Sequence, residues 1–258
     1  MTPLDHSAAV AAETARFVGA VRAADPATPV PTTPGWTLAD LVRHAGSVQR
    51  WFTVLLRQGI QQPPTSRDVD LKLPEQVEAY PDWLAEAVAE AGETFAATDL
   101  DAPMWAWGAD QHARFWVRRM LFETLVHRVD AELALGGKAD IAPDLAADGV
   151  DEFLTNLPYA SFFAPGTAKL RAEDRSIRFT RTDGDGTWLV RLRPDGFGLA
   201  PAGEATPAGE ATPADATISA SAADLLLLLY GRIDHTSAAV TVEGDEALPA
   251  LWFANSAF

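Results

Sequence analysis

The chain has 258 residues, enough for one large domain or two modest ones, and 48% of them are hydrophobic. Its formal net charge of −16 argues against nucleic acid and anionic membrane surfaces as partners, because both select basic patches. The absence of cysteine excludes disulfides, thiolate-ligated zinc and a thiol nucleophile carried by the protein itself.

Neither a membrane span nor a secretory signal is visible in the sequence. The leucine run at residues 225–229 is far shorter than the ~20 apolar residues that a span needs. Residues 1–7 lack a basic segment followed by an apolar core. We therefore expect a cytoplasmic protein without a membrane partner.

The first half of the chain predicts long amphipathic helices, because apolar residues recur with the 3.6-residue period of a helix. Four are expected, at residues 4–24, 37–58, 74–98 and 112–135. Thr37 can cap the second helix through its hydroxyl, and Gly136 and Gly137 can end the fourth. Four antiparallel helices can close into a bundle whose core carries a metal site.

After a linker at residues 138–143, the second half predicts a mixture of helices and strands. Helices are expected at 144–157, 222–230 and 246–255. Strands are expected at 176–181, 187–192, 197–200, 216–220 and 239–243. The predicted fold class is thus mostly α with two domains: a four-helix bundle over residues 1–140, and a small α+β domain with an antiparallel sheet over residues 141–258.

A tandem repeat of Pro-Ala-Gly-Glu-Ala-Thr interrupts the second half at residues 201–217. It has no bulky apolar side chain that could pack. We expect a mobile loop lengthened by duplication, without chemistry of its own.

Two histidines and one glutamate stand where the helical pattern places apolar residues. Glu123 and His127 share a stripe of the fourth helix with Trp116, and His44 lies on the apolar stripe of the second. An unpaired buried charge costs several kcal/mol or more, so these groups must be paired or must hold a metal. Two histidines and one carboxylate make a three-ligand site with open positions, the layout that a catalytic metal needs.

Other interpretations of these residues remain open. A Glu-x-x-x-His spacing is also typical of surface ion pairs, and a lone core histidine is more often hydrogen-bonded structure than a ligand. Asp130 can accept an imidazole N–H beside a metal ligand or make a salt bridge instead. Arg118 and Arg119 can pair with acids on neighbouring turns.

Two interpretations apply to each of four further residues. Trp105, Trp107 and His112 can wall a pocket or pack in the core. Arg232, after the leucine-rich helix, can reach an anionic group across the domain interface or favour the C-terminal end of the helix dipole. His6 and His235 are expected to be solvated.

Three segments resemble signatures of the mycothiol-dependent maleylpyruvate isomerase family, a DinB-like helical group typical of actinobacteria. They are PGWTLADLVRHAGSVQRW (34–51), WVRRMLFETLVHRVDAE (116–132) and, in a domain similar to sterol-carrier folds, SAADLLLLLYGR (221–232) with VTVEGD (240–245). The resemblance implies that His44, Glu123 and His127 bind a divalent metal, usually zinc. It also implies mycothiol as the thiol, and we predict Arg232 as a catalytic residue.

The ligand set predicts a chemistry. Zinc with two imidazoles and one carboxylate keeps a net positive charge, so a bound thiol loses its proton near neutral pH. Without cysteine in the chain, a small-molecule thiol such as mycothiol must supply the sulfur. Its addition to a small electrophile leads either to S-transfer or to cis–trans isomerisation.

Two other functions remain open at this stage. One is metal-dependent hydrolysis, although the chain lacks the His-Glu-x-x-His pattern whose glutamate serves as general base. The other is a non-catalytic protein that binds a structural metal and an apolar ligand. Thiol-dependent turnover would distinguish the S-transferase or isomerase described above from both of these alternatives.

Overall fold

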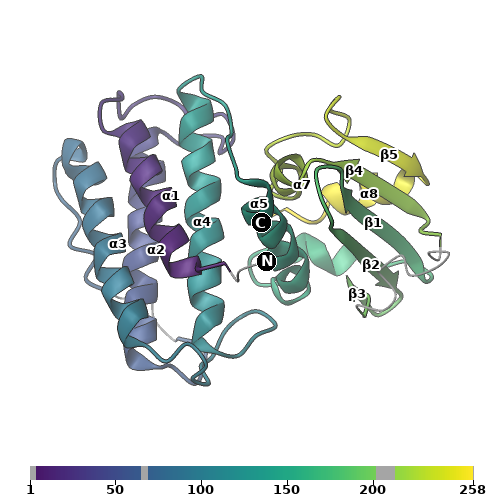
Figure 1. Ribbon diagram of the computed structural model, residues 1–258, viewed down its shortest axis with the longest axis horizontal. Coiled ribbons are helices and arrows are strands. Elements are labelled where there is room, and N and C mark those ends of the chain that lie inside the picture. Colours follow the sequence, from purple (N-terminus) through teal and green to yellow (C-terminus); the bar gives the residue numbers. More distant parts are fainter. Residues whose placement is uncertain (1–3, 65–68, 202–212, 258) are drawn as a thin grey trace. The chain divides into compact units, whose positions relative to one another are not determined.

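A computed structural model of the chain describes residues 4–64, 69–201 and 213–257. The chain forms two compact units, Met1–Asp140 and Ile141–Phe258 (Figure 1). The first is built from helices and the second combines helices with a sheet, which confirms the predicted fold class. None of the helices in the described ranges has both the length and the apolar character needed to cross a bilayer.

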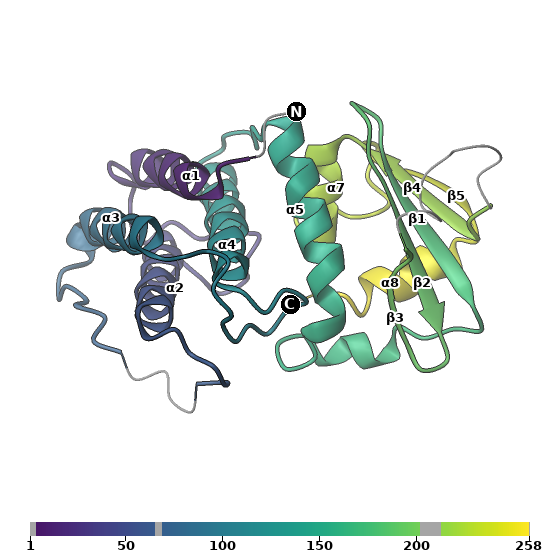
Figure 2. The same cartoon turned by 60° about the horizontal axis from the view of Figure 1, so that its bottom comes forward.

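The first unit is a helical bundle. Its helices are α1 (His6–Val21), α2 (Leu38–Gln58), α3 (Tyr80–Ala97) and α4 (Ala113–Ala134), with a short 3-10 helix, η1 (Val77–Ala79), before α3. Both α1 and α2 pack against α3 and α4 (Figures 1 and 2). Helix α3 begins later than predicted, because a helix continuing from residue 74 would place Pro81 in its interior, where proline breaks the hydrogen-bond ladder.

A capping box starts α2, as the sequence predicted for Thr37. The Thr37 hydroxyl oxygen accepts from the Asp40 backbone N–H at 3.3 Å, and Asp40 Oδ2 accepts from the Thr37 N–H at 3.1 Å. Gly35 precedes this cap with a φ of +88°, a conformation that favours glycine. The tight turn fixes Trp36 beside the first turns of α2.

Two contacts hold the bundle helices in register. Arg128 on α4 is fully buried and forms ion pairs with Glu13 on α1 at 2.8 Å and with Glu132 at 2.7 Å. Helices α2 and α3 approach closely at Gly46, where an added Cβ would lie 2.2 Å from Cζ3 of Trp83. Only a residue without a side chain fits between these two helices.

The second unit contains a five-stranded sheet in the order β3-β2-β1-β4-β5. Its strands are β1 (Arg175–Arg181), β2 (Thr187–Arg193), β3 (Gly196–Leu199), β4 (Ala216–Ala220) and β5 (Thr241–Gly244). Its helices are α5 (Pro143–Asn156), α7 (Ala222–Leu229) and α8 (Ala247–Phe253), with 3-10 helices η2 (Leu157–Tyr159) and η3 (Pro165–Lys169). Helix α5 packs on α7, and α7 packs on β1 and β4 (Figure 2).

The sheet is antiparallel in three of its pairings, as predicted, but β1 and β4 run parallel. The hairpin signals predict only how β1, β2 and β3 follow one another. The direction of β4 is not predicted by these signals, because β4 pairs with β1 rather than with the strand that precedes it in the sequence.

The predicted mobile repeat falls largely on residues 202–212, which lie outside the described residues. Its last unit is held in place, contrary to that prediction. Asp215 Oδ2 accepts from the Ser176 N–H at 2.8 Å, and its Oδ1 lies 2.8 Å from Nε of Arg175. Burial tends to raise the pKa of Asp215, but the hydrogen bonds from Ser176 and the Arg175 charge lower it overall.

Candidate metal centre

The structure brings His44, Glu123 and His127 together, although they come from two helices. One nitrogen of each imidazole and one oxygen of the carboxylate all lie within 4.8 Å of one another. Glu123 Oε1 lies 3.0 Å from Nε2 of His44 and 3.3 Å from Nε2 of His127. The packing of α2 against α4 thus joins the two stripes on which the sequence placed these residues.

Two charged side chains orient the cluster. Arg119, one turn before Glu123 on α4, donates from Nη2 to Glu123 Oε2 at 2.8 Å, so Oε1 is the oxygen that faces both histidines. Asp130 is fully buried, and its Oδ2 lies 2.9 Å from Nδ1 of His127. A carboxylate on Nδ1 selects the tautomer in which Nε2 is available as a ligand.

Trp36 covers the histidines from the turn before α2. Its ring centroid lies 5.1 Å from that of His44 and 6.3 Å from that of His127, and the two imidazoles meet edge to face at 4.9 Å. The side chains of His44, Glu123 and His127 are 35%, 21% and 12% exposed. The cluster is therefore sheltered on the His127 side and open on the His44 side.

The electrostatics of the cluster favour a cation. Burial lowers the pKa of His127, but its hydrogen bonds to Asp130 and Glu123 outweigh this and raise that pKa to about 9. Burial would raise the pKa of Glu123, but hydrogen bonds from His127 and His44 and the charge of Arg119 hold it well below its usual range. Without metal, His127 is thus protonated and Glu123 is ionised. A metal ion that binds these two side chains would displace the proton of His127.

Two of the three spacings between the donor atoms match those around a divalent metal. Zinc–ligand bonds of ~2.0–2.1 Å in a tetrahedron place neighbouring ligand atoms about 3.3 Å apart. The two distances from Glu123 Oε1, 3.0 Å and 3.3 Å, lie close to that value. Two imidazoles and one carboxylate leave further coordination positions for a substrate or water.

A cavity of about 640 Å³ opens on the exposed side of His44. It is lined by Gly35, Trp36, Asp40, Arg43, His44, Ser47, Leu71 and Leu73. Of the residues in this wall, only His44 was predicted from the sequence as a site residue. The signal for the rest was present in the α2 sequence, where Asp40, Arg43 and Ser47 occupy the same helical face as His44.

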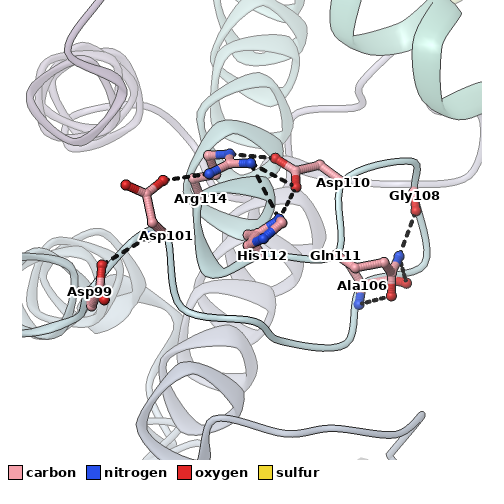
Figure 3. Close-up of polar contacts among 8 residues, drawn as sticks. All are labelled: Asp99, Asp101, Ala106, Gly108, Asp110, Gln111, His112 and Arg114. Carbon is pink, nitrogen blue, oxygen red and sulfur yellow. Dashed lines mark hydrogen bonds and ion pairs between the residues drawn. The ribbon is translucent and has the colours of Figure 1, made fainter.

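The loop before α4 does not contribute to the cluster described above. His112 Nδ1 lies 2.6 Å from Asp110 Oδ1, and Arg114 binds both Asp110 and Asp101, so these charges satisfy one another (Figure 3). Gln111 holds the same loop closed through the backbone of Ala106 and Gly108 (Figure 3). These polar contacts stabilise the loop that precedes α4.

The two loop tryptophans are half-buried and contact aromatic rings rather than the cavity beside His44. The Trp105 ring lies 5.7 Å from that of Trp116, and the Trp107 ring meets Phe115 edge to face at 5.3 Å. Trp116 also donates its indole N–H to the Trp105 carbonyl at 2.9 Å. Both tryptophans thus pack against the start of α4.

Arg232 lies in the second unit, beside a cavity of about 260 Å³. Its Nη1 donates to the Tyr230 carbonyl at 2.7 Å, which directs part of the guanidinium back to the end of α7. His235 lines the same cavity and stacks on Phe253, with ring centroids 5.3 Å apart. His235 is therefore packed against a ring rather than solvated as predicted.

Family models match both units of the chain. The mycothiol maleylpyruvate isomerase N-terminal domain matches residues 7–132, and the MDMPI C-terminal domain matches residues 144–251. These two matches cover most of the sequence. The chain therefore belongs to the mycothiol maleylpyruvate isomerase family.

Solved structures show the same fold. The chain resembles two crystal structures of mycothiol-dependent maleylpyruvate isomerase, one of them a point mutant. Each has a TM-score of 0.61 and 15% sequence identity, over 93% of this chain and 92% of the other. No curated protein matches the sequence with significance.

Proposed function

We propose that this chain is a mycothiol-dependent enzyme whose His44, Glu123 and His127 hold one divalent metal, with zinc the best match to the donor set. The observation that carries the proposal is the meeting of these three side chains within 4.8 Å. Membership of the mycothiol maleylpyruvate isomerase family supports the choice of thiol. The absence of cysteine from the chain means that the reacting sulfur must arrive with a small molecule.

When bound, the metal supplies positive charge that lowers the pKa of a thiol toward neutrality. The chain's own residues prepare that place. Arg119 fixes the Glu123 carboxylate through Oε2, and Asp130 holds the Nδ1 proton of His127, so Oε1 and Nε2 converge. Trp36 covers both imidazole rings and excludes water from one side, which strengthens electrostatic interactions within the site.

The proposed reaction is cis–trans isomerisation of an electron-poor alkene such as maleylpyruvate. The thiolate sulfur forms a C–S bond to one alkene carbon, and the π electrons move onto the conjugated carbonyl oxygen. The former double bond can then rotate. Return of the electrons restores the alkene in the trans form, breaks the C–S bond and releases the thiolate unchanged.

We further propose that Arg232 binds an anionic group of the electrophile. Its guanidinium lines the cavity of about 260 Å³ in the second unit, and a guanidinium matches a carboxylate with two parallel hydrogen bonds. Asp234 lines the same cavity and limits its positive charge. Replacement of Arg232 by lysine keeps the charge but loses the paired geometry, so it should raise the KM for a carboxylate substrate.

Thiol-dependent turnover tests the proposal. The metal-loaded protein is incubated with maleylpyruvate, with and without mycothiol, while isomerisation is followed by absorbance and S-conjugates are sought by mass spectrometry. We expect isomerisation only with mycothiol, its loss in His44→Ala and its retention in His112→Ala. A stable conjugate would indicate S-transfer. Hydrolysis without thiol, or no reaction and no thiol binding, would contradict the proposal.

A further inference from the structure

One wall of the cavity beside His44 comes from a segment that is held by few contacts. Leu71 and Leu73 line this cavity and lie in the irregular stretch between α2 and η1. None of residues 69–76 is buried, and Leu73 is 40% exposed. Segments with few buried contacts open at a low cost in free energy. We call residues 69–74 the strap.

Two polar contacts join the strap to the helices within the described part of the chain. The Trp83 indole N–H donates to the Leu71 carbonyl at 2.8 Å, and Lys72 Nζ lies 3.7 Å from Glu90 Oε2. Both partners belong to α3, whereas the strap faces α2 across the cavity. Trp83 is itself fixed, because it is 2% exposed and packs against Gly46. The strap is therefore latched to a rigid helix at two points.

The ion pair is the weaker point of attachment. The Lys72 side chain is 61% exposed, and such surface pairs contribute little to stability. Glu90 does not depend on Lys72, because its carboxylate also accepts from Arg57 at 2.7 Å and from Arg50 at 3.1 Å. The hydrogen bond from Arg57 is the main reason that the pKa of Glu90 is lowered. The strap can thus leave α3 without leaving an unpaired carboxylate behind.

The backbone of the strap opposes the latched position. Lys72 has a φ of +47°, a conformation that is costly for a residue with a side chain. A local hydrogen bond from its N–H to Asp70 Oδ1 at 3.0 Å supports the turn. This strain offsets part of the attraction to α3, so the latched and released states differ little in free energy.

We propose that the strap is a gate to the cavity beside His44. While the Leu71 carbonyl is bonded to Trp83, Leu71 and Leu73 form the apolar wall opposite Ser47. Release of this bond moves the wall away from α2, so that molecules enter and leave the cavity. Closure by such segments shields a site from water. The gate acts on any ligand of the cavity, so it does not depend on the thiol proposed above.

Hydrogen exchange of the Trp83 indole reports release directly, because its N–H is the donor of the latch. NMR spectroscopy follows it in the full chain. Lys72→Ala loses the ion pair and keeps the strained conformation, so exchange should be about two- to fivefold faster than in wild type. Lys72→Gly adopts the same conformation without strain, so exchange should be at least about fivefold slower than in Lys72→Ala. The Trp116 indole, which donates to the Trp105 carbonyl, is the control and should not change.

A single introduced thiol reports access to the cavity. The chain has no cysteine, so Ser47→Cys places one thiol on the α2 wall. Its rate of reaction with neutral dithiodipyridine is measured with a chelator present, so that no metal shields it. Adding Lys72→Ala should raise this rate about two- to fivefold, and adding Trp83→Phe, which removes the latch donor, about two- to tenfold. Gln58→Cys is the control, because Gln58 is exposed at the end of α2 and outside the cavity.

The outcomes separate a gate from other causes. If indole exchange responds to Lys72→Ala while the thiol of Ser47→Cys does not, the strap moves but is not a gate. Equal acceleration at Ser47→Cys and Gln58→Cys would indicate general loosening of the bundle and would overturn the proposal. So would rates that Lys72→Ala and Trp83→Phe leave unchanged in variants that circular dichroism shows to be folded. Neither measurement needs mycothiol or bound metal, so the test stands even if the proposed function fails.

Discussion

Asp130 Oδ2 lies 2.9 Å from Nδ1 of His127, and the carboxylate is completely buried one turn further along α4. This contact faces away from Glu123, which His127 meets through its other nitrogen at 3.3 Å. A histidine held in this way has its ring orientation determined before any ion arrives, and when an ion displaces the Nε2 proton the remaining proton stays on Nδ1. The arrangement is the one that metal-binding histidines use to raise their basicity.

Replacement of Asp130 by asparagine should therefore weaken metal binding. The amide keeps the shape of the side chain but removes the negative charge, and losses of about 10–100-fold are typical for such partners. Competition with a chromogenic chelator measures the dissociation constant. Asp82→Asn, at an aspartate 69% exposed on α3, serves as the control and should leave affinity unchanged. Equal affinity of wild type and Asp130→Asn would contradict the role given to this contact.

Metal binding should release a proton. The pKa of His127 is raised from 6.5 to about 9 without metal, so its protonated form stabilises the folded metal-free protein below pH 6.5, and this stabilisation is lost as the pH rises through about 9. An ion must displace that proton, so affinity should rise about tenfold per pH unit within this range. Calorimetry at neutral pH in buffers of different ionisation enthalpy counts the proton. A heat independent of the buffer would refute the prediction.

Gly46→Ala should destabilise the bundle. The new Cβ would lie 2.2 Å from the Trp83 ring, and such overpacking costs about 1–3 kcal/mol of the free energy of unfolding. Gly92→Ala on α3 is the matched control, because nothing lies within 4 Å of its added Cβ. It should instead gain about 0.5–1 kcal/mol through helix propensity. Urea denaturation measures the stability of both variants. A Gly46→Ala protein more stable than Gly92→Ala would contradict the prediction.

Arg128→Ala should be among the most destabilising changes in the first unit. It removes the fully buried cation between Glu13 and Glu132, and an uncompensated buried charge costs about 3–5 kcal/mol. Arg22→Ala, at an arginine 60% exposed and paired with Asp82, should change stability by less than about 0.5 kcal/mol. Denaturation curves that place both variants within error of wild type would rule out this role for Arg128.

The sequence predicted most of the helices and the meeting of His44, Glu123 and His127, because both depend on local periodicity. The cap at Thr37 and the position of His44 on the inner face of α2 follow from spacing along one helix. Glu123 and His127 meet His44 because the apolar stripes of α2 and α4 face the same core. The parallel pairing of β1 and β4 could not be predicted, because it depends on the path of the chain between distant strands.

Contacts made by irregular segments were also beyond sequence reasoning. Trp36 lies in a turn whose direction depends on the positive φ of Gly35, and no helical period applies there. The carbonyl of Leu71 is held by Trp83 from another helix, so the cavity wall is visible only in the folded chain. The placement of His235 against Phe253 likewise joins segments that share no sequence pattern.

We propose that His44, Glu123 and His127 hold a metal to which mycothiol binds, and the absorption spectrum of the cobalt-substituted protein tests this most directly. Wild type should take up about one cobalt ion per chain, as a three-ligand site does. Adding mycothiol should then produce a thiolate-to-cobalt charge-transfer band. His112→Ala should behave like wild type, since His112 is engaged with Asp110, whereas His44→Ala and Glu123→Ala should give no band. Equal cobalt loading in His44→Ala, or a wild-type spectrum unchanged at saturating mycothiol, would contradict the account.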